Sequence, residues 1–229
     1  MPTAAEVMQE LEALGSAQTV KTYRRHGVGT HVGVFGVSYA DLGRLKKRLK
    51  TNQALARDLW TTRNHDARAL AMMIVNPAET TSDEVEVWLR DSDYYGMTTP
   101  VAQLAAQMPQ AVERAARWSA DESEWIARAG WQTVEALALA TNDLPDSYFE
   151  ALLPQIEAGI HGAKNRVGAA MNDAMIAIGV RNEALRERAA AAAARIGKVH
   201  VDHGDTACKT PDAAPYMEKI WARRGQRAK

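Results

Sequence analysis

Apolar side chains recur along this chain at intervals of three and four residues, which places them on one face of an α-helix. The pattern is clear over residues 42–49, 85–89, 101–108 and 171–178. A period of two, which is typical of strands, is not seen. The composition agrees, because Ala, Leu, Met, Arg, Gln and Glu are frequent and only two Phe occur. The sequence predicts an all-α protein.

Polar residues mark the expected starts and breaks of these helices. Ser38, the stretch 80–82 and Ser119 each come shortly before acidic residues. Hydroxyl side chains cap helix N-termini, and acids in the first turn suit the helix dipole. Prolines are expected between helices or in their first turns, at Pro77, Pro100, Pro109, Pro145 and Pro154.

A weak internal repeat suggests how the helices are arranged. The sequence DARA at 66–69 is echoed by IARA at 126–129, and Ala-rich second helices recur at spacings of roughly 30 to 40 residues. This predicts a HEAT-like (armadillo-type) helical-repeat solenoid, whose second helices line a concave face. An irregular globular bundle is the alternative.

The character of the chain changes after Gly197. Residues 198–210 are polar and rich in His, Asp and Thr, and a short helix is expected over 213–224. We therefore divide the chain into one helical-repeat domain, residues 1–197, and a C-terminal tail, residues 198–229, that packs on the solenoid or extends from it.

The size and the cysteine content favour a cytoplasmic protein. The chain has 229 residues, and its only cysteine, Cys208, cannot form an internal disulfide. No stretch approaches 18 uncharged apolar residues, so we expect no membrane span.

Charge is segregated along the chain although the formal net charge is zero. Residues 1–50 hold 8 basic and 4 acidic residues, residues 51–160 hold 7 and 17, and residues 161–229 hold 13 and 7. Basic segments at both ends suit a phosphate-bearing partner. Ordinary solvated surface explains the same distribution equally well.

The sequence resembles a known family, the DNA alkylation repair proteins of the AlkD type, which are HEAT-like-repeat DNA glycosylases. The resemblance implies an all-α repeat fold that grips duplex DNA from its backbone side and releases N3- and N7-alkylated purines. It rests on FGVSYADLGRLKKRLK (35–50), ALARDLWTTRNHDARALAMMIVNP (54–77), EVWLRDSDYYGMTTPVA (86–102), ESEWIARAGWQTVEALAL (122–139) and the tail IGKVHVDHGDTACKTPDAAPY (196–216).

The resemblance fails at the position of the catalytic acid. The family's site resembles tandem aromatics followed by a catalytic Asp, and the aromatics here are Tyr94 and Tyr95. The position of the acid is occupied by Thr99, which is neutral and cannot stabilise an oxocarbenium-like sugar. Asp173 stands near the position of the family's second site aromatic, and it is the candidate for a relocated acid. A solvated or ion-paired helix acid is the plainer interpretation of Asp173.

Candidate DNA contacts come from three places. Arg128 matches the family's backbone-contacting arginine, and an ion pair with Glu124, four residues earlier, is the structural alternative. Tyr95 and Trp125 are candidates for contacts in the cleft, although core packing explains Trp125 as well. The basic stretch 44–50 supplies candidate phosphate contacts at Arg44, Lys46 and Lys47.

The tail gathers His203, Asp205 and Cys208, a group that suggests metal or nucleophilic chemistry. The spacing does not match a structural zinc site, and no oxyanion hole accompanies a Cys–His pair. We therefore expect hydrogen bonding of the tail to the rest of the protein, with no metal and no cofactor.

The sequence thus predicts a monomer that binds the phosphate backbone of duplex DNA and lacks alkylpurine glycosylase activity of the usual kind. One alternative is an active glycosylase that uses a relocated acid such as Asp173. Another is a scaffold for a protein partner without a DNA role.

Overall fold

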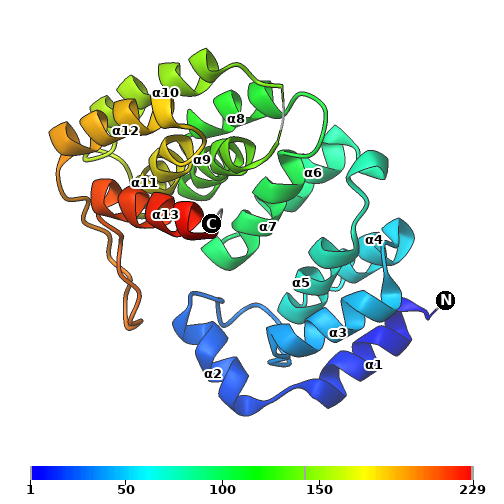
Figure 1. Ribbon diagram of the computed structural model, residues 1–229. Coiled ribbons are helices and arrows are strands. Elements are labelled where there is room, and N and C mark those ends of the chain that lie inside the picture. The colour runs from blue at the N-terminus through cyan, green and yellow to red at the C-terminus, as the bar shows by residue number, and fades with distance from the viewer. Residues whose placement is uncertain (1, 142, 228–229) are drawn as a thin grey trace. The chain divides into compact units, whose positions relative to one another are not determined.

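The computed structural model describes residues 2–141 and 143–227. These residues form thirteen α-helices and one short 3₁₀-helix, and they contain no strand beyond an isolated bridge between Gly33 and Asn64 (Figure 1). The expectation of an all-α protein is confirmed. No helix in the described ranges is long and apolar enough to cross a membrane.

The chain forms two compact units. Unit 1 comprises Met1–Pro109 with Gly204–Thr206, and unit 2 comprises Gln110–His203 with Ala207–Lys229. Unit 1 contains α1 (Ala4–Leu14), α2 (Ala17–Arg25), α3 (Tyr39–Leu49), α4 (Gln53–Thr61), α5 (His65–Ile74), η1 (Pro77–Glu79), α6 (Ser82–Arg90) and α7 (Tyr95–Ala105). Unit 2 contains α8 (Ala111–Ser119), α9 (Glu124–Leu139), α10 (Asp146–Gly159), α11 (Asn165–Gly179), α12 (Glu183–Ile196) and α13 (Ala213–Arg227).

In unit 1, α5 is the central helix. It packs against α4, its predecessor in the chain, and also contacts α1, α3 and α7. Leu42, Leu59, Leu70 and Ile74 are completely or almost completely buried in the core. Their burial supplies the hydrophobic free energy that holds the short helices together, since isolated helices of about ten residues are marginal in water.

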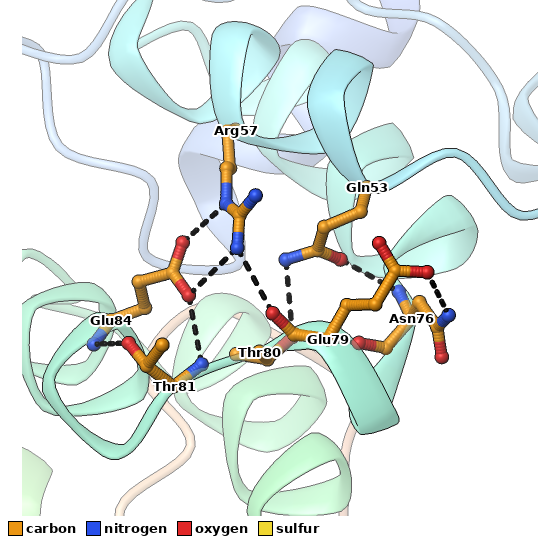
Figure 2. Close-up of polar contacts among 7 residues, drawn as sticks. All are labelled: Gln53, Arg57, Asn76, Glu79, Thr80, Thr81 and Glu84. Carbon is orange, nitrogen blue, oxygen red and sulfur yellow. Dashed lines mark hydrogen bonds and ion pairs between the residues drawn. The ribbon is translucent and has the colours of Figure 1, made fainter.

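A polar network joins α4 to the start of α6 (Figure 2). Arg57 donates from Nε to Glu84 Oε1 at 2.5 Å and from Nη2 to the carbonyl of Glu79 at 2.9 Å. Glu84 also accepts the N–H of Thr81, whose side chain caps α6 in return. The Arg57 guanidinium holds the pKa of the Glu84 carboxyl below its usual range. Gln53 adds a second link, because its Oε1 accepts the N–H of Asn76 at 2.9 Å.

A buried carboxylate fixes the loop before α3. Asp66, in the first turn of α5, accepts the backbone N–H groups of Phe35, Gly36 and Val37 at 2.7, 3.2 and 2.8 Å. The next residue, Ser38, caps α3 by accepting the N–H of Asp41. Asp66 therefore sets the position at which α3 begins.

In unit 2, α9 packs against α8 on one side and against α11 on the other. Gly130 allows α8 and α9 to approach closely, because an added Cβ would lie 2.2 Å from the backbone nitrogen of Ser119. The predicted repeat of Ala-Arg-Ala is seen in equivalent places: Arg68 and Arg128 are both buried near the start of the second helix of a pair, α4–α5 and α8–α9.

The helix expected in the tail is present as α13, which packs against α11 and α12 (Figure 1). Met217 is fully buried, and Trp221 Nε1 donates to the carbonyl of Gly179 at 3.0 Å. The division of the chain at residue 197 stays a prediction, and residues 228–229 of the predicted tail lie outside the described residues.

Two local expectations are wrong. Ser119 does not start a helix: it ends α8, and α9 starts at Glu124 because Asp121 accepts the N–H of Ser123 and forms a turn first. Pro100 and Pro154 lie inside α7 and α10 rather than between helices or in first turns. The starts at Ser38 and Thr81 are confirmed by their capping hydrogen bonds.

Candidate nucleic-acid interface

Unit 1 contains a cavity of about 630 Å³ bounded by residues of α3, α5 and α7. Its walls combine two tyrosine rings with methionine and glutamine side chains and one lysine. The lining residues include Tyr39, Lys46, Met72, Met73, Tyr95, Thr99, Gln103 and Gln107. The predicted residues Tyr95, Thr99 and Lys46 are therefore brought together in one place.

The adjacent tyrosines Tyr94 and Tyr95 lie in different environments. Tyr94 is buried, its hydroxyl contacts His65 Nδ1, and burial raises its pKa well above the usual range. Tyr95 is half-buried and lines the cavity, and its hydroxyl lies 2.6 Å from His26 Nδ1. One aromatic packs while its neighbour faces the cavity, because α7 starts at Tyr95 and Tyr94 is extended.

Thr99 lies where the resemblance expects a carboxylate. Its Oγ1 donates to the carbonyl of Tyr95 at 3.0 Å, one turn earlier on α7. None of the residues lining this cavity is acidic. The cavity therefore offers a developing sugar cation no fixed negative charge.

The cations of α3 differ in how far they are already engaged. Arg44 is paired with Asp41, and Arg48 binds the carboxylate of Glu10 through both of its terminal nitrogens. Lys46 and Lys47 are exposed, and neither has an acidic partner within residues 2–141 and 143–227. Together with Lys50, which is also exposed, these two lysines are the part of the predicted basic stretch that is available to a phosphate.

Unit 2 holds a second cluster, made by Arg128 and Glu135 of α9 and Asp173 of α11. Arg128 is only 7% exposed, and both acids line a cavity of about 440 Å³ together with Pro211 and Tyr216 of the tail. Burial and, to a smaller extent, the neighbouring Asp173 raise the pKa of Glu135 to about 7, although Arg128 acts in the opposite direction. Burial raises the pKa of Asp173 to about 6, again against Arg128.

Glu135 was not among the candidates from sequence. It also accepts a hydrogen bond from Gln132 Nε2 at 2.7 Å, while Gln132 Oε1 is buried without a partner among the described residues. A protonated Glu135 could donate to that orphaned oxygen, which agrees with the raised pKa. The sequence spacing could have indicated that Glu135 lies near Arg128, because the two residues are seven positions apart and share a helix face.

The other predicted residues of α9, Glu124 and Trp125, lie in the first turn of this helix. Trp125 is half-buried in the first turn, and Glu124 accepts the backbone N–H of Arg166 at 2.7 Å. The Glu124 carboxylate thus links α9 to the start of α11. Trp131 is buried in the core of unit 2.

The three tail residues singled out from the sequence, His203, Asp205 and Cys208, are divided between the two units. His203 Nε2 lies 2.9 Å from Thr210 Oγ1 in unit 2, where Cys208 is exposed. Asp205 belongs to the short stretch that is grouped with unit 1. In the part of the chain that the structure describes, no three His, Cys, Asp or Glu side chains are placed to hold a metal ion. Asn165 anchors the tail by two hydrogen bonds with the backbone of Asp202, at 2.7 and 2.8 Å.

The raised pKa of Glu135 makes stability depend on pH. The folded protein keeps a proton on this group up to about pH 7, whereas the unfolded chain releases it near 4.5. This group therefore lowers stability increasingly as the pH rises through that interval. We expect Glu135→Gln to raise the free energy of unfolding by about 2 kcal/mol more at pH 8 than at pH 5.

Denaturant titrations at the two pH values measure this difference. Glu187→Gln is the matched control, because Glu187 is an exposed acid on α12. Equal gains at pH 5 and pH 8 for Glu135→Gln would show that its carboxyl titrates normally.

Comparison with known proteins shows the family of this chain. The family model described as "DNA alkylation repair enzyme" matches residues 7–217. The chain belongs to this DNA alkylation repair family. It is 32% identical over 224 residues to the uncharacterized protein Lin0241 of Listeria innocua and 31% identical to Lmo0209 of Listeria monocytogenes, with 96% of this chain and 97% of each relative covered.

The fold of this DNA alkylation repair protein is similar to that of a protein of known structure. With a TM-score of 0.87 and 28% identity, 97% of this chain matches 95% of a protein described as one of "a new family of proteins related to the HEAT-like repeat DNA glycosylases with affinity for branched DNA structures". The expected family and the HEAT-like helical-repeat fold are confirmed. The roles of the individual site residues stay predictions.

Proposed function

We propose that this protein binds DNA through its phosphate backbone, with preference for branched over plain duplex DNA, and that it does not release alkylated purines by the usual route. The observation that carries the proposal is the pair of exposed lysines on α3, of which Lys46 lines the cavity of unit 1. A protein of the DNA alkylation repair family presents exposed Lys46 and Lys47 beside a site where Thr99 replaces the expected acid.

Phosphate binding follows from the charges on α3. Lys46 and Lys47 are exposed cations without acidic partners in the described residues, and binding to phosphate releases counterions from the DNA. These contacts carry no sequence information, so the protein would bind many sequences with similar affinity. The net charge of zero means that only such local basic patches can attract DNA.

The preference for branched DNA is supported by the solved relative, which is described as having affinity for branched DNA structures. A branch point brings several phosphate backbones close together, so a few well-placed cations contact more charge there than on a straight duplex. We place the protein in the cytoplasm as a monomer.

The proposal is tested by measuring dissociation constants for a four-way junction, a duplex and a single strand over a range of salt concentrations. We expect the junction to bind most tightly and the affinity to fall steeply with salt. In the double variant Lys46→Ala, Lys47→Ala, the slope of log K against log[salt] should become shallower by about 2.

The control is the double variant Arg188→Ala, Arg195→Ala, which removes the same charge from α12. These arginines are paired with Glu150 and Glu157 on α10. A slope that changes equally in both double variants would attribute binding to net charge alone. If no DNA binds even at low salt, the DNA role fails and a scaffold for a protein partner becomes the better interpretation.

A second candidate function, an active alkylpurine glycosylase, is favoured by one observation. Asp173 lines a partly apolar cavity beside Arg128, and with a pKa of about 6 it is ionised at neutral pH. An ionised carboxylate in such a setting is able to stabilise a sugar cation. Excision assays on DNA that carries N7-methylguanine separate this candidate from the first.

A further inference from the structure

The cavity of unit 1 has the size and the lining of a ligand site rather than of a packing defect. Its volume of about 630 Å³ falls within the range of about 300–1,000 Å³ that is typical of small-molecule sites. Met72 and Met73 give it an apolar part, and Gln103 and Gln107 add amide groups at its edge. Phosphate binding by α3 does not by itself require such a cavity.

Two aromatic rings at this cavity are held in place and remain accessible. Tyr39 is 54% exposed, although its ring makes an edge contact with Tyr23 at a centroid distance of 6.2 Å. Tyr95 is tied at its hydroxyl to His26. An exposed, positioned tyrosine ring is a suitable platform for stacking a flat π-system.

The polar groups narrow the class of ligand further. Amide side chains such as Gln103 can donate to and accept from the hydrogen-bonding edge of a base. Lys46 lines the same cavity and is also one of the exposed cations of α3. A ligand that has a flat ring at one end and a negative charge at the other is therefore complementary to the cavity and the neighbouring lysines.

We propose that this cavity takes one unpaired nucleobase of a DNA strand whose phosphates lie along α3. The proposal rests on the DNA-binding function proposed above and adds to it a preference for DNA that carries unpaired bases. Bases within a duplex or within the arms of an intact four-way junction are stacked and paired, whereas bulges and single-stranded flaps present bases that enter a cavity without the cost of unpairing. Tyr39 and Tyr95 would stack on the base, and Gln103 would contact its edge.

The test uses two duplexes that differ at one position. Both carry a single-nucleotide bulge, which is a normal nucleotide in one and an abasic residue in the other. Because stacking on an aromatic ring contributes about 1–3 kcal/mol per base, we expect the bulged base to bind about tenfold more tightly than the abasic bulge. 2-Aminopurine placed in the bulge should change its fluorescence on binding, because stacking on tyrosine alters its surroundings.

Tyr39→Ala should strongly reduce the tenfold difference, because one of the two stacking rings is lost. It should leave the salt slope unchanged, because the ring carries no charge. Gln103→Ala should reduce the difference in part. The matched control is Tyr216→Ala, which removes an exposed tyrosine from unit 2 and should keep the full difference.

Equal affinity of the wild-type protein for both bulges would overturn the proposal while salt-dependent DNA binding still stands. A difference that survives Tyr39→Ala together with Gln103→Ala would also overturn it, because the base would then be recognised elsewhere. If neither bulged duplex binds at low salt, the proposed DNA function itself fails.

Discussion

Replacing Asp66 by alanine is expected to lower the free energy of unfolding by about 3 to 5 kcal/mol. The carboxylate is completely buried and accepts three backbone N–H groups, from Phe35, Gly36 and Val37. Without it, these donors lose a charged acceptor, and those of Gly36 and Val37 are buried away from water. A single change would therefore release the whole loop that leads into α3.

The loss should extend to the cavity of unit 1. The loop ends at Ser38, which caps α3, and Tyr39 is the first residue of that helix. A released loop leaves Tyr39 and Lys46 less well positioned, so DNA binding should weaken together with stability. Denaturant titration measures the first effect, and the salt-dependent DNA titration measures the second.

Two further variants test whether the buried carboxylate of Asp66 holds the loop. Asp66→Asn preserves the shape but has one acceptor oxygen in place of two and brings an N–H₂ group against N–H donors, so it should also be strongly destabilised. Asp58→Ala removes an exposed acid from α4 and should change stability by less than about 0.5 kcal/mol. If Asp66→Ala were as stable as Asp58→Ala, the loop would be held by other contacts.

Features that depend on neighbouring residues in the sequence could be predicted from it. The caps at Ser38 and Thr81 follow from a hydroxyl group placed three residues before an acid, and the structure contains both. Ser119 fits the same pattern, with Glu122 three residues later, but it ends a helix, because Asp121 makes its own turn with Ser123. Local rules cannot decide between two competing side chains that both cap or turn the backbone.

Features that depend on distant residues could not be predicted in this way. Asp66 looks like an ordinary first-turn acid, and its three donors lie about thirty residues earlier. Glu135 looks like a surface acid until α11 places Asp173 beside it and burial raises its pKa. The family resemblance supplied the place of Thr99 and Tyr95, but only the structure shows that Lys46 shares their cavity.

Thr99→Asp is expected to increase the release of N7-methylguanine from duplex DNA by about 10²- to 10³-fold over a wild-type protein that excises slowly or not at all. When the bond from the sugar to an alkylated purine breaks, the base leaves neutral and the sugar becomes an oxocarbenium-like cation. Removing one preorganised electrostatic group from an enzyme costs a factor of this size, and restoring one should return it.

The local geometry favours a productive carboxylate at this position. Thr99 uses its hydroxyl to donate to the carbonyl of Tyr95, which aspartate cannot do in its ionised form. Repelled by that carbonyl, the carboxylate should turn into the cavity, towards the side that Lys46 also lines. Thr98 Oγ1, at 3.4 Å, continues to donate to Tyr95, so α7 should keep its structure.

The control and the competing hypothesis are measured in the same excision assay. Gln107→Asp places an acid two turns later on the wall of the same cavity and should give no comparable gain, because stabilisation of the cation requires a particular position and not merely negative charge. An active glycosylase with a relocated acid makes the opposite forecast: wild-type protein excises well, Asp173→Asn abolishes the activity, and Thr99→Asp adds little. A gain shared equally by Thr99→Asp and Gln107→Asp would contradict the assignment of position 99. Failure of every variant to excise, with DNA binding intact, would mean that the sugar of the lesion does not reach this cavity.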